Sequence, residues 1–259
     1  MKVMIYDLQK ASALKRISAF LLDVVLFVIL ATGAASLISS IVGYDNYLAK
    51  FEEIKSEYAE EYGINLDISD EELEKLSGEE KAKFDAANTA FSKDEEAIAL
   101  YQTMMTLILL MVSISPFVGC FVVDFLIPLF LRNGQTPGKK IFGIGVMMVN
   151  GVRITAPALF VRAILGKYVL ETAVPLVMLI MALFGLGDGF IMLAVCFGIV
   201  AANLALLCVN SKRSLLHDYL SYTVCVDMAS QMIFENVEAL EEYKARVNAE
   251  RAEDRTDTF

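Results

Sequence analysis

Hydrophobic residues gather in four long runs, which cover residues 17–42, 104–131, 163–186 and 190–209. A helix needs roughly 20 apolar residues to cross the hydrocarbon core of a bilayer, and each run reaches that length. Only a short turn around Asp188, flanked by glycines, separates the last two runs. The pattern therefore predicts four membrane-spanning helices, the last two of which form a tight hairpin.

Residues 43–100 interrupt this pattern with a strongly polar segment. They carry 17 acidic and 6 basic side chains, a net charge of −11, whereas the whole chain carries −10. Apolar and aromatic side chains recur in it at helical spacing, and three Ser-x-x-Glu patterns are typical of helix N-termini. The stripe is Phe51, Ile54, Tyr58 and Tyr62, and the three patterns begin at Ser69, Ser77 and Ser92. We predict an acidic helical insert between the first two spans. It is either a solvated hairpin or a module that binds a protein partner.

Two further patterns lie outside the spans. Residues 144–149 and 152–155 are rich in β-formers and flank Asn150-Gly151, which predicts a hairpin with a type I′ turn. Residues 222–227 form another β-rich run that would pair with this hairpin. Thr155 and Pro157 mark the start of a helix that leads into the third span, and residues 230–255 read as a charged C-terminal helix.

Composition excludes several classes of function. Hydrophobic residues make up 56% of the chain, and no basic patch with interleaved aromatic residues is present, so we expect no nucleic-acid partner. The chain has one His and four Cys without a CxxC spacing, so we expect neither a metal site nor a cofactor. The four are interpreted as small apolar residues: Cys120, Cys196, Cys208 and Cys225.

The basic residues near the span ends predict the orientation. They lie before the first run (Lys2, Lys10, Lys15, Arg16), between the second and third runs (Arg132, Lys139, Lys140, Arg153, Arg162) and after the fourth (Lys212, Arg213). The third–fourth connection has none. The positive-inside rule then places both termini in the cytoplasm and the acidic insert outside.

Polar side chains inside the spans are the candidates for function, because each ionisable one costs about 2.5–3.5 kcal/mol to insert. Counted from the cytoplasmic span ends, several lie about 9–11 Å deep at ~1.5 Å per residue. The set is Asp23, Asp124, Lys167, Glu171 and Asn203. Two interpretations stay open: a hydrogen-bonded cluster that holds the helices in register, or a cytoplasm-facing pocket that responds to a cation or proton. Lys167 and Glu171 alone have the spacing of an i,i+4 pair.

Two short motifs resemble enzyme motifs, but each lacks a feature that the enzyme motif requires. Gly134-Gln135-Thr136-Pro137-Gly138-Lys139 has three residues between its glycines, whereas a nucleotide-binding P-loop has four and a Ser or Thr after the Lys. His217-Asp218 resembles a catalytic dyad, but no nucleophile elbow accompanies it. We therefore expect no catalytic residues and no enzymatic activity.

These same motifs resemble the RDD family of bacterial membrane proteins, over residues 14–42 and 101–227. The similarity rests on Arg16 with Asp23, the glycine loop at 134–139, Asn150-Gly151, Arg162 and His217-Asp218. The resemblance implies that the three name-giving residues are Arg16, Asp23 and Asp218. It also implies a membrane fold and transport of unidentified ligands.

The sequence thus predicts an all-α membrane protein with four transmembrane helices, a small cytoplasmic β-hairpin element and a soluble helical insert. The expected segments are 1–42, the insert 43–100, 101–227 with the closing His-Asp segment, and the C-terminal helix 228–259. The first functional hypothesis is transport of a cation or small solute, which implies a homo-oligomer because four spans are few for a transporter. The alternative is a non-catalytic binding or assembly protein that uses the insert and the C-terminal helix. We also predict that Arg16 bonds Asp23 or Asp218, because its planar fork suits a carboxylate.

Overall fold

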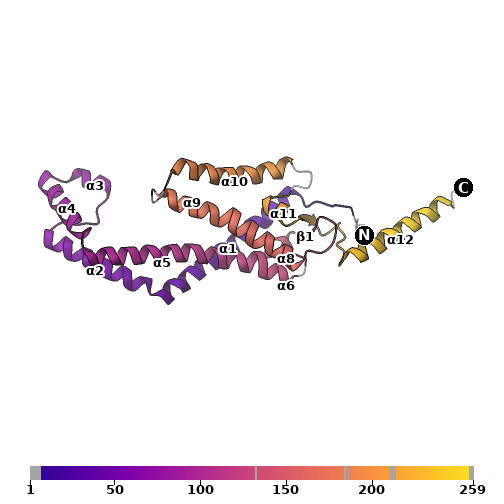
Figure 1. Cartoon of the computed structure of the whole chain (residues 1–259), viewed down its shortest axis with the longest axis horizontal. Helices are drawn as coiled ribbons and strands as arrows, with labels where there is room; N and C mark the ends of the chain where they lie inside the picture. Colours follow the sequence, from indigo (N-terminus) through magenta and orange to yellow (C-terminus); the bar gives the residue numbers. More distant parts are fainter. Residues whose placement is uncertain (1–6, 132, 184, 186, 210–213, 257–259) are drawn as a thin grey trace. The chain divides into compact units, whose positions relative to one another are not determined.

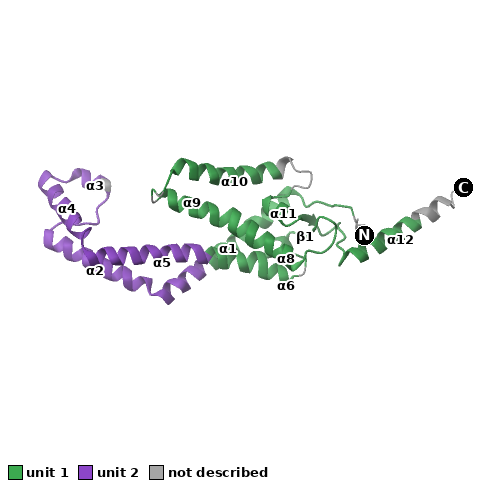
Figure 2. Cartoon of the chain, viewed as in Figure 1, with its two compact units in different colours: residues 1–31, 116–259 green, residues 32–115 purple. Residues whose placement is uncertain are grey.

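The computed structural model describes residues 7–131, 133–183, 185, 187–209 and 214–256 (Figure 1). The chain divides into two compact units, which are described separately (Figure 2). Unit 1 comprises Met1–Ala31 and Pro116–Phe259, and unit 2 comprises Thr32–Ser115. Of the basic residues that predicted the orientation, Lys2, Arg132, Lys212 and Arg213 lie outside the described residues.

Four helical stretches in the described part of the chain are long and apolar enough to cross a membrane, as predicted. The first is α1 (Ala13–Val42), and the fourth is α10 (Gly189–Val209). The second runs through α5 (Glu95–Cys120), η1 (Phe121–Leu126) and α6 (Ile127–Phe130). The third runs through α8 (Ala156–Phe160), η2 (Val161–Ala173) and α9 (Val174–Leu183). Thr155 begins the third stretch as predicted, because its hydroxyl accepts the Ala158 N–H.

Both η1 and η2 are π-helices, which the sequence did not predict. In a π-helix the backbone hydrogen bonds join residues five apart instead of four, so the turn is wider and its side chains leave the 3.6-residue period. In η2 the Thr172 hydroxyl donates to the Lys167 carbonyl at 2.9 Å, five residues back. Segments of this kind often lie at functional sites, and η2 carries Lys167 and Glu171.

The sheet of unit 1 has two antiparallel strands, β1 (Ile144–Met148) and β2 (Thr223–Asp227), with Val146 opposite Cys225. The pairing of residues 222–227 with the 144–149 run was predicted and is confirmed. Lys10 adds a bridge to Val226, so the N-terminal segment lies along β2. The sheet therefore joins three segments that are distant in the sequence.

The predicted hairpin at Asn150-Gly151 is wrong in its details. Among the described non-glycine residues only Tyr222 has a positive φ, so Asn150 does not adopt the type I′ conformation. Instead, the Gly151 N–H donates to the Met148 carbonyl at 3.0 Å, and Gly151 has φ 90°. This is a three-residue loop that ends in a glycine. Beyond it, the Met148 N–H donates to the Val152 carbonyl at 2.9 Å and Met147 forms an antiparallel bridge to Arg153, so a short hairpin is present, and Val152 also bridges Phe234.

The remaining elements of unit 1 are short, apart from the last. They are α7 (Pro137–Ile141), α11 (Leu216–Leu220) and α12 (Val237–Thr256). The C-terminal helix begins later than the predicted residue 230. The preceding residues are extended because Gln231 accepts the Gln9 N–H at 2.7 Å and Ile233 packs on the sheet.

Unit 2 contains the insert, which forms α2 (Tyr44–Tyr62), α3 (Asp70–Lys75) and α4 (Gly78–Phe91). The capping boxes at Ser69 and Ser77 are confirmed. The third predicted box is wrong: Ser92 ends α4, and Asp94 caps α5 by accepting the Ala97 N–H at 2.7 Å.

The predicted aromatic stripe of α2 packs against α4. The Phe51 and Tyr58 rings lie 5.3 and 5.9 Å from the Phe91 ring, and the Tyr58 hydroxyl donates to Asp94 at 3.1 Å. The acidic side chains around this contact are largely exposed, so the insert packs α2 against α4 and presents an acidic outer surface.

Candidate functional site

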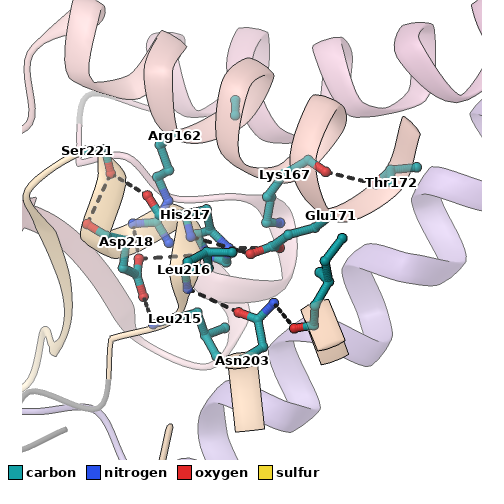
Figure 3. Close-up of polar contacts among 12 residues, drawn as sticks. Arg162, Lys167, Glu171, Thr172, Asn203, Leu215, Leu216, His217, Asp218 and Ser221 are labelled. Atoms are coloured by element: carbon teal, nitrogen blue, oxygen red, sulfur yellow. Dashed lines mark hydrogen bonds and ion pairs between the residues drawn. The ribbon is translucent and has the colours of Figure 1, made fainter. Parts of the chain in front are cut away.

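The centre of the candidate site is the carboxylate of Asp218, which is fully buried. Arg16 Nη2 donates to its Oδ2 at 3.1 Å. Arg162 Nη1 lies 2.5 Å from its Oδ1, and Figure 3 shows Arg162 beside Asp218. Both arginine side chains are at least nine-tenths buried. The predicted bond between Arg16 and one of the two carboxylates is therefore confirmed for Asp218.

The short helix α11 places Asp218. Its side chain accepts the Leu215 N–H at 3.1 Å, which closes the N-terminus of the helix onto its own third residue. Burial alone would raise the pKa of Asp218, but Arg162, His217 and Arg16 outweigh it and hold that pKa well below its usual range. Asp218 is thus ionised and ties α1, η2 and α11 together.

His217 connects α11 to the third span. Its Nδ1 lies 3.0 Å from both carboxylate oxygens of Glu171, and its backbone N–H donates to Glu171 at 3.3 Å. Burial lowers the pKa of His217 despite the neighbouring Asp218 and Glu171 carboxylates, so the neutral imidazole is favoured at pH 7.

Lys167 and Glu171 do not bond each other, which corrects the i,i+4 interpretation. Lys167 forms an ion pair with Asp124 on η1, whereas Glu171 faces His217. Both residues lie in η2, whose π-helical turn is wider than that of the α-helix on which the i,i+4 spacing relies. Each therefore joins η2 to a different element.

Asn203 links the fourth span to the same segment. Its side-chain oxygen accepts the Leu216 N–H at 3.0 Å, and its amide donates to the Ile199 carbonyl at 3.3 Å. Figure 3 shows Asn203 beside the start of α11, near Glu171 and His217. The fourth span thus reaches the site through a backbone contact rather than an ion pair.

Asp23 is held by the glycine loop and not by Arg16. The Thr136 hydroxyl donates to it at 2.5 Å and the Gly138 N–H at 2.8 Å, and Asp23 is 5% exposed. A Cβ on Gly138 would lie 2.2 Å from the Ala19 carbonyl oxygen, so only glycine allows α1 this close.

The rest of the glycine loop positions these donors. Gly134 has φ +60°, a conformation that favours glycine. The Gln135 side chain donates to the Ile144 carbonyl at 2.8 Å, and Thr136 also caps α7 through the Lys139 N–H. The motif that superficially suggests a nucleotide site therefore holds an intramembrane carboxylate.

A cavity of about 460 Å³ lies among these residues within unit 1. Its polar lining includes seven of the predicted site residues: Arg16, Asp23, Lys139, Lys167, Glu171, Asn203 and His217. The other predicted site residues do not line it. Asp124 pairs with Lys167 and Asp218 pairs with the two arginines, while Thr136 and Gly138 of the glycine loop bond Asp23. The polar groups expected at one depth thus meet at one cavity.

Arg162 is the site residue that the sequence analysis did not select. It appeared only as a basic residue before the third span and as part of the family resemblance. The structure buries it to 4% exposure, where it also donates to the Thr223 hydroxyl at 2.8 Å and to Cys225 Sγ at 3.6 Å. The sequence did contain a signal for this role. Arg162 lies at the start of an apolar span, where an arginine needs a carboxylate partner.

The cysteines and acidic residues give no sign of a metal centre. In the described part of the chain, no group of three or more His, Cys, Asp or Glu side chains has the geometry to hold a metal ion. Cys120 and Cys225 are buried as predicted, and Cys196 is half-buried. The side chain of Cys208 lies outside the described residues.

Four apolar spans around a buried, charge-paired cluster define a polytopic membrane protein. A model of the RDD family matches residues 10–222, which is most of the chain, and the protein belongs to that family. No curated protein and no solved structure matches the chain. The family match agrees with the resemblance carried by Arg16, Asp23 and Asp218.

Proposed function

We propose that the protein transports a small solute and that the cavity of unit 1 is its binding site. The observation that carries this proposal is the convergence of ionisable groups from separate elements on one space. Arg16 and Asp23 come from α1, Lys167 and Glu171 from η2, and His217 from α11. A volume of about 460 Å³ falls in the range of roughly 300–1,000 Å³ that is typical of small-molecule sites.

Lys139 favours a binding site over a cluster that only holds the helices in register. Its ammonium lies 3.3 Å from the Thr136 hydroxyl, and among the described residues no carboxylate oxygen lies within 4.0 Å of it. A structural cluster is expected to pair its charges, because an uncompensated buried charge is costly. A lysine that lines a cavity without a carboxylate partner has donors available for a ligand.

We also propose that both termini face the cytoplasm of a bacterial cell. The three segments that the positive-inside rule assigns to one side pack together in unit 1. The Ala11 N–H donates to the Cys225 carbonyl at 3.3 Å, the Asp227 N–H donates to the Gln9 carbonyl at 2.9 Å, and β1 pairs with β2. Their shared side supports an even number of crossings, and their basic residues support the cytoplasmic side.

The proposal includes assembly into a homo-oligomer. The fourth span contacts α9 and α11 but keeps a broad apolar surface, with Phe190 82% and Phe197 71% exposed. Lipid or a second copy would cover this surface. Four helices enclose little space for a solute to cross the bilayer. We therefore favour a second copy of the chain, rather than lipid, as the cover of this surface.

The test is flux in proteoliposomes that contain the full chain, with a panel of sodium, potassium, proton, chloride, phosphate and carboxylate gradients. Glu171→Gln keeps the side-chain shape but removes the charge beside His217, and we expect it to abolish flux. Glu53→Gln, at an exposed position of α2, is the matched control and should transport normally. Unchanged flux in a folded Glu171→Gln variant, or no flux of any solute with the wild type, would overturn the proposal.

A second candidate is assembly through the acidic insert, which the separate packing of unit 2 favours. Deletion of residues 43–100, replaced by a short Gly-Ser linker, should leave membrane insertion intact while removing crosslinks to outward-facing proteins. A deletion variant that does not reach the membrane would contradict this role. The C-terminal helix α12 would serve a cytoplasmic partner in the same way.

A further inference from the structure

We propose that the cavity of unit 1 binds a membrane lipid with an anionic headgroup, which enters sideways from the bilayer between α1 and α10. The inference rests on the proposed function only in taking the cavity as a binding site, and it names the class of ligand. Of the ligands that the sequence left open, it disfavours the cation.

The polar lining of the cavity contains more cations than carboxylates. Four basic side chains line it, against two carboxylates: Arg16, Lys139, Arg162 and Lys167 against Asp23 and Glu171. Both lining carboxylates already have partners, because Asp23 accepts from Thr136 and Gly138 and Glu171 faces His217. Asp124 and Asp218 do not line the cavity, but they form ion pairs with Lys167 and Arg162 and so compensate part of the positive charge. A cation in the cavity would meet ammonium and guanidinium groups first.

Lys139 is the group best placed to hold an anion. An ammonium has three N–H donors, and the described contacts of Lys139 account for one of them, toward Thr136. Burial and the neighbouring cations Lys167 and Arg162 lower the pKa of Lys139 to about 8. A bound phosphate or carboxylate would relieve this repulsion and favour the charged lysine.

Apolar side chains on the exposed surface of two membrane-spanning helices also line the cavity. Phe20 on α1 and Val200 and Leu204 on α10 all line the cavity, and each remains more than half exposed. These residues lie in two of the membrane-spanning helices. A hydrated free anion would have to pass these side chains, whereas the hydrocarbon chain of a lipid would lie against them. A lining that combines exposed apolar side chains with buried basic ones matches an anionic amphiphile.

The absence of tryptophan from the chain makes a direct test available. A Phe20→Trp variant carries one indole in the lining of the cavity, and lipids with brominated acyl chains quench it on contact. The full-length variant is reconstituted in phosphatidylcholine vesicles that contain either brominated phosphatidic acid or brominated phosphatidylcholine. We expect a roughly fivefold preference for the anionic lipid, the scale of one lysine at a membrane surface.

Variants at two adjacent lysines assign that preference to the cavity. Lys139→Gln in the Phe20→Trp background should lose the preference, and Lys139→Arg should keep it. Lys140→Gln is the matched control, because Lys140 follows on the same helix, is exposed and does not line the cavity. Equal quenching by both lipids, or an unchanged preference in Lys139→Gln, would overturn the proposal.

A further arm separates a lipid from a free anion. If millimolar inorganic phosphate displaces the brominated phosphatidic acid, the acyl chains contribute nothing to binding. That result would overturn the lipid proposal in favour of a site for a free anion. Persistence of the preference in phosphate supports the lipid. Quenching does not depend on flux, so a protein that transports nothing can still show the preference, and a transporter can fail to show it.

Discussion

Arg16, near the start of the first span, donates to Asp218 at 3.1 Å across 202 residues of sequence. The opposite oxygen of that carboxylate faces Arg162 at 2.5 Å, so one acidic side chain serves two arginines. This arrangement differs from a simple pair, because loss of either arginine leaves the carboxylate with the other.

The two arginines should therefore differ in their contribution to stability. Arg162→Ala leaves Asp218, Thr223 and Cys225 without their shared donor, and we expect a loss of about 3–5 kcal/mol, as for a broken buried pair. Arg16→Ala leaves Arg162 in place and should cost about 1.5–3 kcal/mol, the scale of a hydrogen bond to a charged group. Thermal unfolding of the full chain in detergent measures both. An Arg16→Ala variant that is less stable than Arg162→Ala would contradict this ranking.

Gly138 should tolerate no side chain. An added Cβ would lie 2.2 Å from the Ala19 carbonyl oxygen and 2.9 Å from Asp23 Oδ1. We expect Gly138→Ala to lower stability by about 1–3 kcal/mol, because backbone rather than a flexible side chain must move. Gly198→Ala is the control, since nothing lies within 4 Å of a Cβ there. Equal unfolding temperatures for the two variants would show that the loop does not pack against α1 in this way.

Lys139 should titrate near pH 8. Burial and the cations Lys167 and Arg162 lower its pKa from 10.5 to about 8, so competitive acetylation at Lys139, read by mass spectrometry, should be half-maximal there. The folded state releases this proton more readily than the unfolded chain does. The contribution of Lys139 to stability therefore increases between pH 8 and about 10.5.

The cause of that shift can be tested by removing a neighbouring pair. The double variant Asp124→Asn/Lys167→Gln removes one cation and its partner together, which avoids an unpaired charge. Because Lys167 influences Lys139 more than Asp124 does, the midpoint of acetylation should move upward. An unchanged midpoint would show that Lys167 is not a cause of the shift.

The proposed orientation predicts the reactivity of two introduced cysteines. In a background with the four native cysteines replaced, a membrane-impermeant maleimide should label Ser77→Cys from outside intact cells but not Lys140→Cys. Permeabilisation should make Lys140→Cys reactive, which serves as the control for accessibility. Labelling of Lys140→Cys in intact cells would reverse the orientation.

The spans could be predicted from the sequence because hydrophobic length is a local property. The same holds for the caps at Ser69 and Ser77, which need only two residues three positions apart. The cap at Ser92 was misplaced because Asp94 offers a competing oxygen two residues later. Local chemistry predicts that a helix begins there, but does not decide between neighbouring caps.

The pairing of the site was less predictable. That Arg16 would bond a carboxylate followed from charge and depth, but Asp23 and Asp218 were equivalent until the fold placed Thr136 and Gly138 beside Asp23. The partners of Lys167 and Glu171 depend on η2, and a π-helical segment cannot be recognised within a span that is apolar on all sides. Hydrogen-bond partners set by tertiary packing cannot be read from spacing along one helix.

The position of Asp218 near the end of the family-matched region also sets an order for biogenesis. During synthesis Arg16 and Arg162 leave the ribosome before the carboxylate that both contact, which follows all four spans. The cluster can close only once the last hairpin has inserted and α11 has folded back. A nascent chain that stalls before residue 218 would keep two arginines at the membrane boundary without this carboxylate. The contact that stabilises the folded protein can therefore form only after all four spans have been synthesised.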